Sequence, residues 1–112
     1  NSWLAMRSCK TLEVRVNKAM QNAIAVAKFL EGHAKIQRVI YPGLPSHPQY
    51  NIVKKQCKGP GAMISFYVKG GIKHAERLLK SLKLFTLAES LGGVESLIEN
   101  PALMTHGSVP QA

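Results

Sequence analysis

The stretch VNKAMQNAIAVAKFL, residues 16–30, carries the clearest structural signal in the chain. Its apolar side chains recur at steps of four, three, four and three residues, at Val16, Met20, Ala23, Ala27 and Leu30. This spacing places them on one face of a helix, because an α-helix repeats every 3.6 residues. The helix is expected to start after Thr11, a candidate cap, and to stop at Gly32.

The pattern changes on both sides of this helix. Residues 2–9 predict a separate, shorter helix before it. After it, IQRVIY, residues 36–41, is rich in β-branched and aromatic side chains and predicts a strand that ends at Pro42. A stiff connector, residues 44–48, leads to a short amphipathic helix, and Pro48 is compatible with its first turn.

The second half of the chain alternates between the same two kinds of element. AMISFYV, residues 62–68, predicts a strand whose inward and outward side chains alternate. Residues 72–82 predict an amphipathic helix, and residues 83–87 and 94–98 predict two further strands. Helices that alternate with strands predict an α/β sandwich, with the helices packed on one side of a small sheet.

Composition and charge exclude several functional classes. The chain of 112 residues is 46% hydrophobic and 19% charged, which is typical of a globular protein. No apolar run approaches the roughly 18 residues that span a membrane. The net charge is +9, but the basic residues are scattered and are not interleaved with stacking aromatics, so nucleic-acid binding is not expected. The alternative, a basic binding module, predicts an affinity for nucleic acid that falls steeply with salt.

Cysteine and histidine spacing does not predict a metal site. Cys9 and Cys57 are far apart, and so are the four histidines, His33, His47, His74 and His106. Free thiols without a secretion signal favour the cytoplasm. The chain has no initial Met and ends abruptly, so we expect it to be a piece of a longer one.

One short segment has functional character by itself. Glu89 and Ser90 stand just before Gly92 and Gly93, and two glycines let a backbone approach a ligand closely. The alternative is a tight turn between two strands.

Four motifs resemble the cystathionine lyase and synthase family of pyridoxal-phosphate enzymes. YPGLPSHPQ, residues 41–49, and LFTLAESLGGVESL, residues 84–97, are similar to two of its characteristic stretches. Residues 101–106 are similar to its PAxMTH pattern, and residues 7–15 are similar to its RGLKTLxxR pattern, with Ser8-Cys9 in place of Gly-Leu. The resemblance covers nearly the whole chain in order.

The resemblance implies a fold and a reaction. Residues 1–32 would be interdomain helices, and residues 33–112 would be the small carboxyl-terminal domain of a fold-type I enzyme, with a mainly antiparallel sheet. The lysine that forms the Schiff base with pyridoxal phosphate would belong to a large domain absent from this chain, so the chain alone is expected to be inactive. The whole enzyme would be a cytoplasmic homotetramer of the transsulfuration pathway and cysteine biosynthesis. It would cleave L-cystathionine by γ-elimination to cysteine, 2-oxobutanoate and ammonia.

The resemblance also implies which residues face the substrate. Ser90 and Leu91 would lie beside the substrate α-carboxylate, and Thr105 would lie near them. Glu89 would pair with the distal ammonium of cystathionine. The alternatives are a solvated surface charge for Glu89, a turn residue for Ser90 and a helix cap for Thr105. For the chain as a whole, the alternatives are part of a cystathionine γ-synthase, or a non-catalytic domain that associates with full-length subunits.

Overall fold

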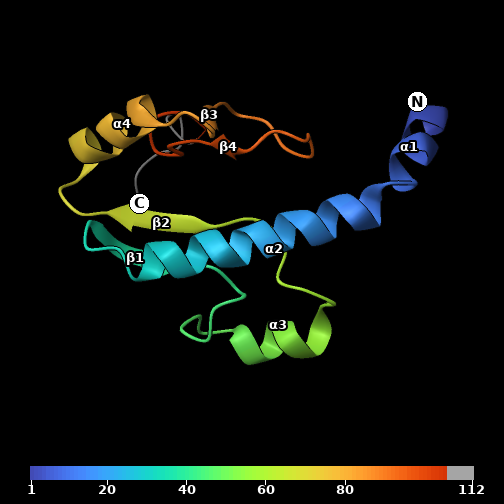
Figure 1. Ribbon diagram of the computed structural model, residues 1–112, viewed down its shortest axis with the longest axis horizontal. Coiled ribbons are helices and arrows are strands. Elements are labelled where there is room, and N and C mark those ends of the chain that lie inside the picture. The colour runs from blue at the N-terminus through green and yellow to red at the C-terminus, as the bar shows by residue number, and fades with distance from the viewer. Residues whose placement is uncertain (106–112) are drawn as a thin grey trace. The chain divides into compact units, whose positions relative to one another are not determined.

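The computed structural model describes residues 1–105, so His106 lies outside the described residues. The chain divides into two compact units, Asn1–Lys69 and Gly70–Ala112. No helix in the described part is both long and apolar enough to cross a membrane. The elements follow one another in this order (Figure 1): α1 (Ser2–Cys9), α2 (Leu12–Glu31), β1 (Ile36–Ile40), α3 (Tyr50–Gln56), β2 (Ser65–Val68), α4 (Ile72–Ser81), β3 (Thr86–Leu87) and β4 (Leu97–Ile98).

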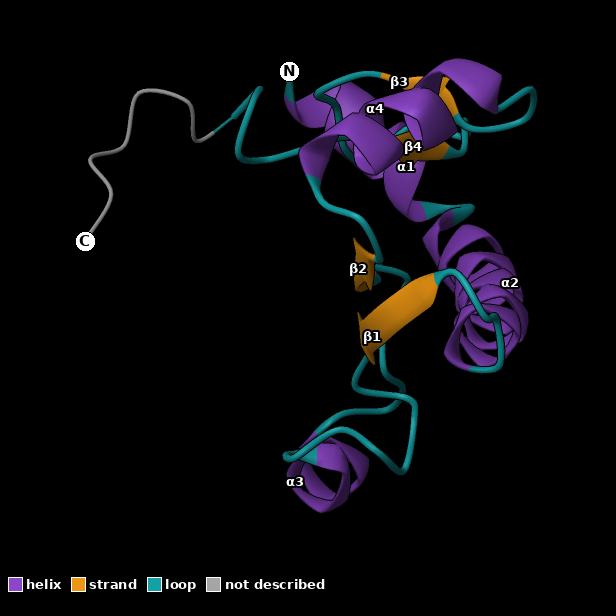
Figure 2. Ribbon diagram, turned by 90° about the vertical axis from the view of Figure 1, so that its left-hand side faces the viewer, coloured by secondary structure: helices purple, strands orange, loops and turns teal. Residues whose placement is uncertain are grey.

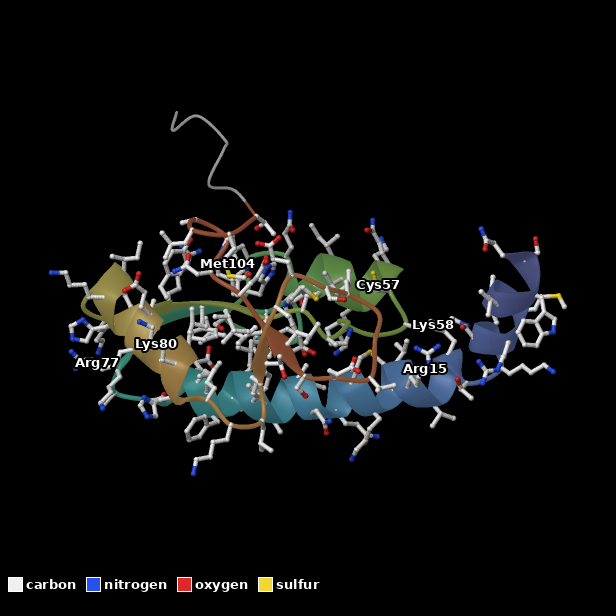
Figure 3. The ribbon with its side chains drawn as sticks, turned by 90° about the horizontal axis from the view of Figure 1, so that it is seen from above. Arg15, Cys57, Lys58, Arg77, Lys80 and Met104 are labelled. Atoms are coloured by element: carbon white, nitrogen blue, oxygen red, sulfur yellow. The ribbon has the colours of Figure 1, made fainter. Side chains whose placement is uncertain are left out.

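An arginine side chain links α1 to α2. Arg15 (Figure 3) donates from Nη2 to the carbonyl oxygen of Ser8 at 3.0 Å and from Nε to Oγ1 of Thr11 at 3.1 Å. The guanidinium thus adds a donor at the end of α1, where carbonyl groups lack partners within the helix. Thr11 occupies the N-cap position, but its side chain makes no capping hydrogen bond. Thr11 therefore stands at the predicted position, but the predicted capping hydrogen bond is wrong. Its hydroxyl oxygen accepts a hydrogen bond from Arg15 instead.

The apolar face of α2 packs beside β1 (Figure 2). Ala23 and Ala27, one helical turn apart, are buried, and Met20 and Leu30 are half-buried. Val16 is 42% exposed, because the N-terminal half of α2 extends beyond the two strands of this unit (Figure 1). The predicted face is confirmed where the helix meets the sheet. Gly32 follows the last residue of α2, as expected.

β1 and β2 form an antiparallel pair, in which Val39 lies opposite Phe66. The register shifts between Ile36 and Arg38, which is a bulge. Both strands were predicted, and each is shorter than its apolar run. In β2 the inward side chains, Phe66 among them, are half-buried and alternate with exposed ones, as the pattern of period two predicts. Pro48 was expected in the first turn of the following helix. Helix α3 begins at Tyr50, so Pro48 precedes the helix.

The core of the first unit joins α2 to the loop that follows β1. Tyr41 and Leu44 are its largest fully buried side chains, and they cluster with Ala23 and Ala27. The Tyr41 hydroxyl donates to the carbonyl oxygen of Gly61 at 2.8 Å, so its polar end is satisfied. The small alanines on α2 leave room for the tyrosine ring, which explains how a loop residue becomes the centre of the core.

Burial raises the pKa of Tyr41 above its ordinary value of 10.0, because desolvation disfavours the phenolate. As the pH rises, the Tyr41 hydroxyl therefore loses its proton at a higher pH in the folded state than in the unfolded state. We expect this contribution to stability to be complete below about pH 10 and to be lost as the pH rises further. Tyr41→Phe removes the hydrogen bond, at a cost of about 1 kcal/mol, together with this pH dependence. The difference in urea midpoint between the full-length wild type and Tyr41→Phe should narrow above pH 10. A constant difference up to pH 11 would contradict the argument.

The second unit begins with the amphipathic helix α4. Its predicted apolar residues Ala75, Leu79 and Leu82 are half-buried, whereas Ile72 is 48% exposed at the first turn. Arg77 and Lys80 are exposed on the same helix (Figure 3). The amphipathic pattern thus identified this helix and most of its packed face.

The last two strands correct the predicted sheet. β3 and β4 are each two residues long, and they pair in parallel. Within residues 1–105 the strands form two separate two-stranded sheets, one antiparallel and one parallel, in place of one mainly antiparallel sheet. Parallel pairing needs a connection that returns to the starting edge of the sheet. The irregular segment 88–96 provides this return, and alternation of side chains alone does not encode the direction of pairing.

Candidate functional site

The predicted site residues follow the ends of β3 and β4. Leu87 of β3 pairs with Ile98 of β4, and the amide of Ala88 donates to the carbonyl oxygen of Ile98 at 3.2 Å. Because these strands are parallel, both segments leave the sheet at the same carboxyl edge. Residues 89–91 begin there after β3, and residues 99–105 begin there after β4. Ligands commonly bind at the carboxyl ends of parallel strands.

The segment after β3 is open to solvent. Glu89 and Ser90 are exposed, and the Leu91 side chain is 78% exposed. Gly92 has a φ of 84°, a conformation that only glycine adopts without steric cost. A turn therefore accounts for Gly92. It does not account for the three residues before it, whose exposed side chains are available to a ligand.

Thr105 is held near the end of β4 by an acidic side chain. Its Oγ1 donates to Oε1 of Glu99 at 3.4 Å, a long hydrogen bond. The amides of Leu103 and Met104 both donate to the carbonyl oxygen of Asn100, at 3.1 and 3.0 Å, so residues 100–104 form a tight turn. The turn brings Thr105 back to the residue that directly follows β4. Thr105 does not cap a helix within the described residues.

The charge of this region is opposite to that of the chain. Three of the six acidic residues, Glu89, Glu95 and Glu99, lie in residues 84–105, which contain no lysine or arginine. The chain as a whole has a net charge of +9. A local excess of carboxylates favours a cationic ligand group such as an ammonium.

The described residues do not by themselves fit a pyridoxal phosphate. A lysine that reacts as a neutral amine needs a desolvated pocket or a neighbouring cation to lower its pKa. Every lysine of the chain is instead exposed. Within residues 1–105, no group of three or more His, Cys, Asp or Glu side chains is placed to hold a metal ion.

The first unit contains hollows that are not lined by any of the predicted site residues. One has a volume of about 250 Å³ and is lined by Glu31, Ile36, Gln37, Arg38, Val39 and Ser46. The other has a volume of about 290 Å³ and is lined by Trp3, Met6, Arg7 and Lys10. Neither hollow includes a residue that the sequence motifs mark as functional, so neither defines the candidate site.

Sequence reasoning missed Glu99. It is the one acidic residue of the chain that is not exposed, and its Oε2 is buried without a hydrogen-bond partner in the described part of the structure. The available signal was weak: a carboxylate directly after the apolar pair Leu97-Ile98. Nothing local indicates that this carboxylate reaches a threonine six residues later.

Comparison with known proteins agrees with the sequence motifs. The family model described as Cys/Met metabolism PLP-dependent enzyme matches residues 1–112. A cystathionine gamma-lyase of Sus scrofa is 62% identical over 110 residues, which is 98% of this chain and 27% of that protein. One of Homo sapiens is 60% identical, covering 96% of this chain and 26% of that protein. A cystathionine beta-lyase of Coxiella burnetii is 53% identical, covering all of this chain and 29% of that protein.

Solved structures show the same fold in a related protein. A cystathionine gamma synthase of Xanthomonas oryzae pv. oryzae, in complex with cystathionine, has a TM-score of 0.93 and 44% identity, covering 98% of this chain and 28% of that one. The chain therefore spans about a quarter of the length of the relatives it matches.

Proposed function

Since the chain belongs to the family of Cys/Met metabolism PLP-dependent enzymes, we propose that it is part of an enzyme that cleaves L-cystathionine by γ-elimination. The reaction consumes water and yields cysteine, 2-oxobutanoate and ammonia. The observation that carries this proposal is the similarity over nearly the whole chain to relatives named cystathionine gamma-lyase, which exceeds that to the beta-lyase.

The cofactor of such an enzyme would be held by residues outside this chain. Bound pyridoxal phosphate supplies an electron sink for negative charge on the amino-acid carbons. The lysines of this chain are exposed, which supports the proposal that the lysine bound to the cofactor lies in another part of the protein. In this proposal the chain contributes binding and orientation, and the rest of the protein contributes the cofactor.

The carboxyl edge of β3 and β4 would hold the amino acid. Ser90 and Leu91 would lie beside the α-carboxylate, where the hydroxyl and backbone amides donate hydrogen bonds that orient the substrate. Thr105 would hold the same region from the other segment. Glu89 would pair with the distal ammonium, and the local excess of carboxylates supports a cation at this place.

Cystathionine γ-synthase activity is the second candidate function. The structural similarity to the gamma synthase of Xanthomonas oryzae pv. oryzae favours it. That reaction would form the bond between sulfur and the γ-carbon that the lyase breaks, so both activities require recognition of the same two amino-acid ends. The residues at the carboxyl edge are compatible with either direction.

The proposal includes the assembly and the cellular location. The whole enzyme would be a cytoplasmic homotetramer, as the motif resemblance implies. A different arrangement, in which this chain exists alone and associates with full-length subunits through α2, is favoured by the exposed apolar side chains of that helix. Leu12, Val14 and Phe29 are 47%, 73% and 66% exposed.

The activity is tested with a full-length protein that contains this chain. We expect purified enzyme loaded with pyridoxal phosphate to release equal amounts of cysteine and 2-oxobutanoate from L-cystathionine. In the synthase direction, with cysteine and an activated four-carbon amino acid, we expect little cystathionine. The 112-residue chain alone should produce neither cysteine nor 2-oxobutanoate, and it should retain no pyridoxal phosphate after gel filtration. Faster synthesis than cleavage would favour the second candidate, and activity of the isolated chain would refute the division of labour.

A further inference from the structure

Glu99 is the one acidic residue of the chain whose side chain is not exposed. It follows Ile98 directly, at the carboxyl edge of the parallel strands. Its Oε2 atom is buried and has no hydrogen-bond partner within residues 1–105, and its Oε1 atom accepts a hydrogen bond from the Thr105 hydroxyl at 3.4 Å. Burying a charged oxygen costs free energy unless a donor meets it, so this carboxylate is held inward against a penalty.

The Thr105 hydroxyl is the group that holds the carboxylate in this position. An ionised carboxylate only accepts hydrogen bonds, so the threonine is the donor of the pair. Within the described part of the chain it is also the single donor to the Glu99 side chain. Without this hydroxyl, both carboxylate oxygens would lack a donor. The side chain would then lower its free energy by turning outward to water.

An outward carboxylate at this edge has a consequence for the proposed substrate. Ser90 and Leu91 leave the same edge, and in the proposed function they lie beside the α-carboxylate of the amino acid. Residues 84–105 contain no lysine or arginine that would neutralise a second negative charge there. Two carboxylates that come close repel each other, so an outward Glu99 would weaken binding of the α-carboxylate.

We propose that Thr105 is a positioning residue, which keeps the Glu99 carboxylate turned away from the α-carboxylate of the substrate. This inference rests on the proposed function and deepens it, because it explains how an acidic region accepts the anionic end of an amino acid. Thr105 acts through Glu99, since its single hydroxyl hydrogen is donated to that carboxylate. The donors that this chain offers to the α-carboxylate are then the Ser90 hydroxyl and backbone amides.

A matched pair of ligands isolates the contribution of the α-carboxylate. Glycine and methylamine share an amino group, and methylamine carries a hydrogen in place of the carboxylate. Each is titrated into the full-length protein loaded with pyridoxal phosphate, and binding is followed by the absorbance of the cofactor. We expect Thr105→Val, which keeps the shape of the side chain and removes the hydroxyl, to raise the Kd of glycine about 10-fold, the order expected for two unit charges a few ångströms apart near the surface. The Kd of methylamine should change less than about 2-fold, as is usual for a surface charge.

Removing the charge of Glu99 should reverse the effect on glycine. The double variant Glu99→Gln, Thr105→Val has no negative charge to turn outward, so it should bind glycine within about 3-fold of the wild type, a span no larger than one neutral hydrogen bond. Glu95→Gln is the control, because it removes an exposed charge of the same region and should not restore glycine binding to Thr105→Val. Thr105→Ser retains the donor and should bind glycine as the wild type does. Added salt should narrow the difference between Thr105→Val and the wild type, because it screens exposed charges.

Three results would overturn the inference. The first is an unchanged Kd for glycine in the Thr105→Val protein, and the second is an equal loss of affinity for glycine and methylamine, which indicates general damage to the site. The third is a double variant that binds glycine as weakly as Thr105→Val does. Thr105 is exposed, so its substitution is not expected to unfold the protein. If the valine variant does not retain the cofactor, Thr105→Ala replaces it in every comparison.

The proposed function and this inference fail in different ways. Wild-type protein that binds glycine but does not cleave cystathionine would refute the proposed lyase activity and leave the effect of Thr105→Val on glycine binding measurable. Normal cleavage of cystathionine, together with a Thr105→Val protein that binds glycine normally, would refute the inference alone.

Discussion

Replacing Glu89 with alanine in the full-length protein is expected to lower kcat/KM for L-cystathionine by about 10- to 100-fold, the range of a hydrogen bond to a charged group. The carboxylate is exposed and lies in a stretch without lysine or arginine, so within residues 84–105 no cation competes for it. In the proposed complex it pairs with the distal ammonium of the substrate. The loss should disappear for the analogue in which hydrogen replaces that ammonium, because the partner is then missing.

The control for this experiment lies six residues away. Glu95 is also exposed and belongs to the same acidic stretch, so Glu95→Ala removes the same charge without removing the proposed contact. We expect kcat/KM for cystathionine to change less than about 2-fold in this variant, as is usual for a surface charge. If Glu89→Ala affects both substrates equally, Glu89 is a surface charge, and specificity for the distal ammonium must come from elsewhere. Raising the salt concentration should weaken the Glu89 effect only slightly, because a substrate-bound pair is shielded from water.

Leu44→Ala is expected to reduce the free energy of unfolding by about 2–5 kcal/mol, the usual cost of a large cavity in a core. Leu44 is only 1% exposed and packs in the same cluster as Tyr41, Ala23 and Ala27. The side chains of the two alanines on α2 are too short to fill the cavity that this substitution leaves. We therefore expect little relaxation and a cost in the upper half of this range.

The measurement is a urea titration of the full-length protein, followed by far-UV circular dichroism and by the yield of soluble protein. Ile52→Ala is the matched control, because Ile52 lies in the same unit, on α3, and is 52% exposed. Removing its methyl groups opens no cavity and should change the unfolding free energy by less than about 0.5 kcal/mol. Equal shifts in the two variants would show that the loop after β1 does not form the centre of the core.

The sequence predicted only part of this core. The periodicity of residues 16–30 correctly placed Ala23 and Ala27 on the packed face of α2, and the β-branched runs correctly predicted β1 and β2. The burial of Tyr41 and Leu44 was not predicted, because Tyr41 stands at the end of a predicted strand and Leu44 begins the predicted connector, residues 44–48. Their burial depends on the approach of α2 and of Gly61, which is distant in sequence.

The candidate site shows a similar division. Resemblance to a family marked Glu89, Ser90, Leu91 and Thr105, and the structure places these residues on the two segments that leave one edge of β3 and β4. That arrangement supports the assignment without testing a role for any single residue. Glu99 came only from the structure, because its burial and its bond to Thr105 are properties of a folded turn.

By itself, the sequence determined the family, the order of helices and strands, and which face of each amphipathic element is apolar. Those properties are local, because the spacing of apolar side chains along the sequence, 3.6 residues in a helix and 2 in a strand, indicates them directly. Only the tertiary structure decided the parallel pairing of β3 with β4, the use of the Thr11 hydroxyl by Arg15 and the placement of Glu99 beside Thr105. Each of these contacts depends on how the chain folds back on itself. The periodicity of neighbouring side chains does not indicate which group a residue will contact after folding.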